Sequence, residues 1–89
     1  MSSAAFALPM AAEGERVTIV AIAGGRPGEK RLIDLGLTVG KELTVLQRQA
    51  QGSLVVALGG ARLALGFAFA QRVLVMPIGG EAIDERRRD

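Results

Sequence analysis

The sequence contains no cysteine and no histidine. Without cysteine no disulfide can form, and without both side chains the usual ligands of zinc, iron–sulfur and haem sites are missing. The same absences remove the commonest general base and the thiol nucleophile of enzymes. The composition therefore argues against catalysis and predicts neither a bound metal nor a cofactor.

Aromatic residues are scarce as well. The chain has three phenylalanines and no tyrosine or tryptophan, although 49% of its residues are hydrophobic. The core must therefore be built from valine, leucine, isoleucine and alanine. Little aromatic surface remains on which nucleic-acid bases could stack.

Charge of one sign is not concentrated anywhere. Residues 81–89 hold three arginines and four acidic residues, and the rest of the chain holds eight basic and five acidic residues, a balance of 8 − 5 = +3. Nucleic-acid-binding domains usually gather more cations on one face, so no nucleic-acid partner is expected. Arg86, Arg87 and Arg88 lie among acids, which is typical of a solvated tail.

Long hydrophobic runs are missing too. Residues 4–12 are apolar, but no basic residue precedes them and Pro9 interrupts them, unlike a secretory signal. The longest apolar stretch, residues 54–70, includes Arg62 and glycines and could not span a membrane. With 89 residues, the chain is expected to form one cytoplasmic domain without membrane insertion.

What is present is alternation. From Glu15, the residues Val17, Ile19, Ala21 and Ala23 fall on one face of a strand that ends at residues 24–25. Further strands are expected at residues 41–48, 53–58, 61–65 and 72–76, with a two-glycine hairpin turn at 59–60.

One helix interrupts the strands. Pro27 and Gly28 are expected to open a helix over about residues 28–36, with its body from Glu29 to Leu35. Gly36 suits a left-handed residue after the helix, and Leu37 can fold back on the last turn. Residues 67–71 predict no more than a single helical turn.

Five short strands and one helix predict an all-β fold, an SH3-like five-stranded barrel with one short helical insertion. An OB-type barrel is the alternative, although it normally carries its helix after the third strand. The expected organisation is an N-terminal lead-in at 1–14, the barrel at 15–78 and a flexible charged tail at 79–89.

Two runs of residues resemble a known family. The run Arg31-Leu32-x-x-Leu35-Gly36-Leu37-x-x-Gly40, followed by Leu43-x-Val45, resembles the central signature of FeoA-domain proteins. The run Gly60-x-Arg62-Leu63-Ala64-Leu65, followed by Ala70-x-x-Val73-x-Val75, resembles their closing hairpin. The resemblance covers residues 8–75. It implies an SH3-like barrel and a role beside FeoB, the GTPase-linked membrane transporter of ferrous iron in bacteria. Similar domains form the C-terminal part of DtxR-type metal-dependent repressors.

The chain departs from the family pattern at two kinds of position. Gly66 and Phe69 stand where family members often carry arginine and glutamate. The stretch from Gly25 to Gly28 lacks the metal-ligating side chains of some regulator versions. Both departures leave this chain with fewer polar groups near the helix and the last strand.

Other candidate sites do not fit their chemistry. Residues 24–28, GGRPG, lack the Lys-Ser/Thr ending of a phosphate-binding loop. Glu29, Asp34 and Glu42 lie on separate elements beside basic residues, which favours solvated surface charge over a carboxylate metal site.

The predicted partner-binding surface is the turn after the helix. It comprises Leu37, Thr38, Val39 and Lys41, with Arg62 on the closing hairpin. Loops on a rigid scaffold are common binding sites, and an exposed valine beside a lysine suits docking to a protein.

The function expected from the residues and the resemblance together is that of a non-enzymatic accessory protein of ferrous iron uptake that binds FeoB. The alternative is a small barrel that binds nucleic acid or regulates transcription, because such barrels are reused for unrelated functions.

Overall fold

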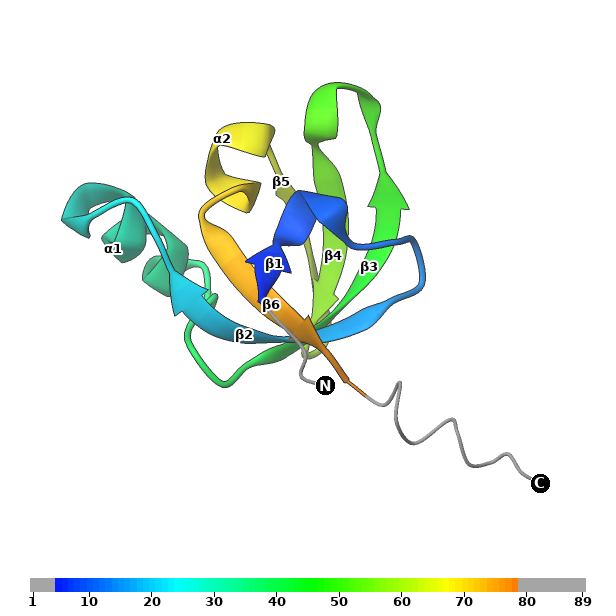
Figure 1. Ribbon diagram of the computed structural model, residues 1–89, viewed down its shortest axis with the longest axis horizontal. Helices are drawn as coiled ribbons and strands as arrows, with labels where there is room; N and C mark the ends of the chain where they lie inside the picture. Colours follow the sequence, from blue (N-terminus) through cyan, green and yellow to red (C-terminus); the bar gives the residue numbers. More distant parts are fainter. Residues whose placement is uncertain (1–4, 79–89) are drawn as a thin grey trace.

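The structure is a computed structural model that describes residues 5–78. Its strands form one antiparallel sheet with the order β1-β6-β2-β3-β4-β5 (Figure 1). The strands are β1 (Phe6–Ala7), β2 (Arg16–Ile22), β3 (Glu42–Arg48), β4 (Leu54–Leu58), β5 (Ala61–Leu65) and β6 (Val73–Pro77). The helices are η1 (Leu8–Met10), α1 (Arg26–Asp34), η2 (Ala50–Gly52) and α2 (Phe67–Ala70), of which η1 and η2 are short 3₁₀ turns.

The predicted fold class is confirmed. A helix is inserted between β2 and β3, and a short helical turn precedes the last strand, as the sequence indicates. The sheet differs from the prediction in two details. The sheet has an additional two-residue strand, β1, which pairs with β6. In the described part of the chain, β5 and β1 are not hydrogen-bonded to each other, so the strongly curved sheet does not close into a full barrel.

Two β-bulges change which residues face the core. In β2 the register with β6 shifts between Ile19 and Ala21, which leaves Val20 as the extra residue. Beyond this bulge Ile22 packs against the core, so the expected alternation is correct up to Ile19 and wrong at Ala21. Leu46 occupies the equivalent place in β3, where the register with β4 shifts. A bulge adds one residue to a strand and therefore reverses the faces beyond it.

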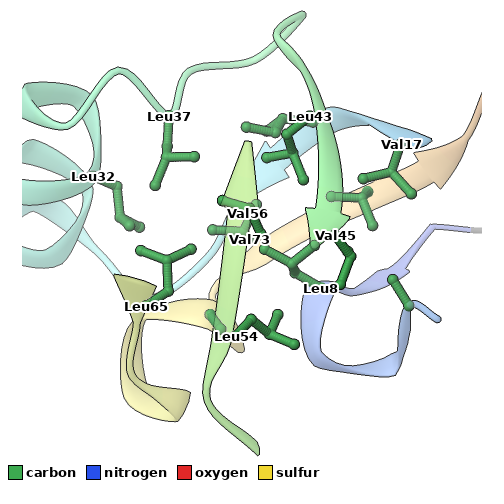
Figure 2. Packing of buried hydrophobic residues seen from close by; sticks show 14 residues of the cluster. Leu8, Val17, Leu32, Leu37, Leu43, Val45, Leu54, Val56, Leu65 and Val73 are labelled. Carbon is green, nitrogen blue, oxygen red and sulfur yellow. The ribbon is translucent and has the colours of Figure 1, made fainter. Parts of the chain in front are cut away.

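The core is entirely aliphatic, as the scarcity of aromatic residues predicts. Side chains from the sheet, from α1 and from the N-terminal segment meet inside the curved sheet (Figure 2). The buried residues are Leu8, Ala11, Val17, Ile19, Leu32, Leu37, Leu43, Val45, Leu54, Val56, Leu65, Ala70, Val73 and Val75.

The N-terminal segment expected as a lead-in takes part in this core. Leu8 and Ala11 are fully buried. The Gly14 N–H donates to the Val45 carbonyl at 2.7 Å, and a Glu13 carboxylate oxygen accepts from the Arg48 N–H at 2.8 Å. The tail expected at 79–89 lies outside the described residues.

Helix α1 begins two residues before the range of about 28–36 given by the sequence. Gly25, with φ 87°, is its N-cap, and Pro27 lies in the first turn, where a missing N–H costs nothing. A Cβ at Gly28 would collide with the Arg72 guanidinium, so the glycine allows this side chain to lie against the helix. The Arg31 guanidinium lies 5.8 Å from the centroid of the Phe69 ring. These contacts join α1 to the segment before β6.

None of the helices within residues 5–78 could cross a bilayer, because the longest, α1, has nine residues.

The turn between β3 and β4 carries backbone strain at a residue that is not glycine. Gln51 has φ 65° and ψ 24°, a left-handed conformation that costs an L-residue about 1 kcal/mol or more. We expect Gln51→Gly to raise the free energy of unfolding by about 0.5 kcal/mol or more, measured by urea denaturation. Gln49→Gly is the matched control, because Gln49 is extended at φ −118° and the same change should destabilise there. Equal effects at both positions would contradict the assignment of strain to Gln51.

Candidate protein-binding surface

The end of α1 fixes the course of the chain into the predicted surface. Gly36 has φ 94°, and its N–H donates to the Ile33 carbonyl at 2.8 Å. The Leu37 N–H donates to the Leu32 carbonyl at 2.9 Å. These two bonds form a complete Schellman motif. Leu37 is fully buried and points into the core (Figure 2), so it anchors the turn and leaves its neighbours to face solvent.

Residues 38–41 form a tight turn that is fastened to the sheet. The Lys41 N–H donates to the Thr38 carbonyl at 3.1 Å, and Gly40, third in the turn, has φ 94° as a type II turn requires. The Gly40 N–H donates to the Ile19 carbonyl at 2.8 Å, and the Ile19 N–H donates to the Lys41 carbonyl at 2.9 Å. The N–H and the carbonyl of Ile19 are thus both bonded to residues of the turn. The turn therefore holds its shape without a bound protein.

The fastened turn presents Val39 to solvent. Its side chain is 64% exposed, Lys41 beside it is exposed, and Thr38 is half-buried. An exposed β-branched side chain on a rigid turn loses little entropy on binding, which makes it a suitable anchor for a protein partner.

Arg62 lies in a different part of the molecule from this turn. It pairs with Ala57 on β4, Ala57 pairs with Thr44 on β3, and Thr44 lies three positions after Lys41. Two strand spacings and three residue rises put the Cα atoms of Lys41 and Arg62 roughly 14 Å apart. The structure therefore groups Thr38, Val39 and Lys41 and leaves Arg62 as a separate cation on the outer face of β5.

Further apolar side chains near the turn are exposed to solvent. Ile33 and Leu35 at the end of α1 are 47% and 42% exposed, and Val20, the bulge residue beside Ile19, is 36% exposed. The spacing of Leu32, Ile33 and Leu35 along the helix predicts apolar contacts for Ile33 and Leu35, but not for Val20. In the last turn of α1 only Leu32 is buried, because α1 packs against the sheet along one narrow side.

A second group of exposed apolar residues lies at the other helical segments. Met10 on η1 is 73% exposed and Phe67 on α2 is 46% exposed. α2 adjoins both η1 and η2, and the Phe67 ring lies so close to Gly52 that a Cβ there would collide with it. Phe67 is thus partly fixed by packing, whereas Met10 is free to reach solvent.

The charged residues do not gather into a reactive site. Within residues 5–78, no three acidic side chains come together as metal ligands would. The ion pair found in that range joins Arg16 to Glu42 at 3.3 Å, with both side chains about 60% exposed. A pair so exposed contributes little to stability.

Comparison with known proteins gives a consistent result. Residues 6–77 match the family model described as FeoA domain. The crystal structure of an iron uptake regulatory protein (FeoA) is similar at 31% identity and a TM-score of 0.78, covering 84% of this chain and 100% of that one. A FeoA protein from Chlorobium tepidum is 28% identical at a TM-score of 0.74, covering 84% of this chain and 72% of that one.

A regulator is similar as well. A manganese-dependent transcriptional repressor is 25% identical at a TM-score of 0.78, and the match covers 88% of this chain but 44% of the repressor. Among curated proteins, none matches the sequence.

Proposed function

Because the chain belongs to the FeoA family, whose model covers residues 6–77, we propose that it is a non-enzymatic accessory protein that binds the cytoplasmic region of a FeoB-type transporter. Membership of the family implies that the chain is involved in ferrous iron transport. The contact with the transporter, the cytoplasmic location and the absence of catalysis go beyond membership.

The observation that carries the binding role is the rigid turn with Val39 at its tip. Val39 is 64% exposed, while Gly40 and Lys41 on the same turn are bonded to Ile19. Ile33 and Leu35 extend the apolar surface along the end of α1. Thr38, Val39 and Lys41 form the centre of the proposed contact, with Leu37 beneath them as its support and Arg62 at a distance.

Replacing Val39 with aspartate should weaken binding to the FeoB cytoplasmic region by at least about 1 kcal/mol, because a charge would then have to be desolvated at the contact. The fold should be unaffected, since Val39 is exposed. Isothermal titration calorimetry with the purified FeoB region measures the first effect, and thermal melting measures the second.

Val39→Thr is the matched control, because threonine has nearly the same shape and no charge. It should bind within about threefold of the unmutated chain. If Val39→Asp binds as tightly as Val39→Thr, the contact lies elsewhere, and Met10 with Phe67 forms the next surface to test.

A role in transcriptional regulation is the second candidate, favoured by the similarity to the manganese-dependent repressor. This chain spans less than half of that protein, so the repressor's activity as a whole does not transfer with the shared domain. Titration of the purified chain with single-stranded and duplex oligonucleotides at low salt separates the two roles, because nucleic-acid binding by cations is strongest there.

A further inference from the structure

Strand β5 is one edge of the sheet. It pairs with β4 along Ala61 to Leu65 and has no strand on its other side within residues 5–78. In Figure 1, β5 lies partly behind β4 and leads into α2. An edge strand offers a row of backbone N–H and C=O groups to any extended chain that can reach it.

The two edges of the sheet differ in how well they are protected. Strand β1 has two residues, and Pro9 and the turn η1 follow it at once. Strand β5 has five residues in regular register with β4, without a bulge, and contains no proline. Proteins usually protect edges by shortness, proline, bulges or charged side chains. β5 has no proline and no bulge, and its one charged side chain is Arg62.

The hairpin turn fixes which groups of β5 face outward. Gly59 has φ 62°, and Gly60, which follows it, has no positive φ, the pattern of a two-residue type II′ turn. Such a turn makes Leu58 and Ala61 a hydrogen-bonded pair, so Arg62 and Ala64 direct their N–H and C=O groups away from β4. In the described residues, no hydrogen bond joins β5 to a segment other than β4.

The side chains of β5 indicate what would pair with it. Arg62 is exposed on the outer face and has no ion pair within residues 5–78. Leu63 is half-buried and packs against the core. An added strand with a carboxylate opposite Arg62 and an apolar residue opposite Leu63 would complement both faces.

We propose that β5 binds an extended acidic segment of a protein partner by strand addition, with Arg62 selecting a carboxylate. The inference rests on the proposed accessory role and names the kind of segment that the FeoB-type partner would supply. Backbone hydrogen bonds from Arg62 and Ala64 would give affinity, and the charge of Arg62 would give register and specificity.

A second copy of this chain meets charge repulsion at this edge in the two registers centred on Arg62 and Leu63. In a two-fold antiparallel pairing of β5 with itself, both copies of Arg62 lie on the same face of the joined sheet. A dyad at Arg62 opposes the two guanidinium groups directly, and a dyad at Leu63 leaves them diagonal neighbours. Like charges so placed across strands are destabilising.

Ala64→Pro tests the backbone part of the proposal. Proline removes the outward N–H without removing a bond to β4, a position where edge strands tolerate it. We expect the affinity for the FeoB cytoplasmic region to fall about tenfold, measured by calorimetry. Ala64→Thr, which keeps the N–H, should bind like the unmutated chain. Thermal melting of both variants shows whether the fold is intact, and if Ala64→Pro fails to fold, the peptide experiment below decides the question.

Arg62→Glu tests the charge without any assumption about FeoB. The probe is a blocked synthetic heptapeptide of alternating valine and glutamate, and its control has lysine in place of glutamate. We expect the unmutated chain to favour the acidic peptide and Arg62→Glu to favour the basic one by about fivefold, measured by fluorescence anisotropy. Amide exchange of Arg62 and Ala64 should slow when the acidic peptide is bound.

The outcomes separate this proposal from the proposed function. If FeoB binds and Ala64→Pro binds equally well, strand addition is wrong and the accessory role stands. If FeoB does not bind but the peptide preference reverses with Arg62→Glu, the accessory role fails and the acidic-segment site stands. The acidic-segment site is overturned if the unmutated chain does not favour the acidic peptide over the basic one. It is also overturned if sedimentation shows a dimer that Ala64→Pro dissociates.

Discussion

Replacing Leu8 with alanine is expected to lower the free energy of unfolding by about 3 kcal/mol. Leu8 is fully buried although it precedes the first long strand by several residues. The truncation removes buried methyl groups and leaves a cavity under η1, where β1 and β6 hold the backbone in place. For a domain of this size, such a loss is a large part of the total stability.

Met10→Ala is the matched control for Leu8→Ala. Met10 belongs to the same 3₁₀ turn but is 73% exposed, so its truncation should change stability by no more than about 0.5 kcal/mol. Urea denaturation followed by circular dichroism measures both variants. If Leu8→Ala were as harmless as Met10→Ala, the N-terminal segment would be a detachable lead-in, and a chain starting at Glu15 would fold by itself.

Replacing Leu37 with alanine is expected to cost about 3 kcal/mol in the free energy of unfolding. Leu37 is fully buried, and its N–H closes the Schellman motif at the end of α1. Loss of the side chain removes the apolar contact that usually accompanies this motif, while the hydrogen bonds between Ile19 and the turn at residues 38–41 remain. Leu35→Ala is the control, because Leu35 is 42% exposed and lies two residues away.

Leu37→Ala and Val39→Asp should therefore affect different properties, the first the stability of the fold and the second the affinity for FeoB. At a temperature where the variant remains folded, Leu37→Ala should lose stability and keep most of its affinity for FeoB. Val39→Asp should keep its stability and lose affinity. If Leu37→Ala instead reduced affinity while leaving the melting temperature unchanged, its side chain would act at the contact and not beneath it.

The helix ending shows how far local sequence determines structure. The Leu-Gly-Leu pattern at residues 35–37 predicts a left-handed Gly36 and a leucine folded back on the helix, and both are present. This motif depends on residues that are neighbours in the chain, so its physics is contained in the local sequence. The predicted start of α1 is two residues late, because Pro27 and Gly28 can either precede a helix or lie within its first turn.

The turn proposed as the partner contact was predictable as a local structure but not in its details. Gly36 and Gly40 mark a tight turn, which is a local property. Which of its side chains face solvent depends on the sheet, because Ile19 fastens the turn and directs Leu37 inward and Val39 outward. The separation of Arg62 from this turn follows from the order of β3, β4 and β5.

The sequence by itself determined which side chains the protein has for binding and packing, and the class of fold. The lack of cysteine and histidine, the aliphatic composition and the period-two alternation are properties of the chain before it folds. The tertiary structure alone decided the position of the bulges at Val20 and Leu46, the burial of Leu8 and the exposure of the β5 edge. Each depends on pairing or packing between segments far apart in the chain, and a one-residue change in register reverses every side chain beyond it. Local periodicity therefore specifies that strands form, and the contacts between them specify which residues a partner can reach.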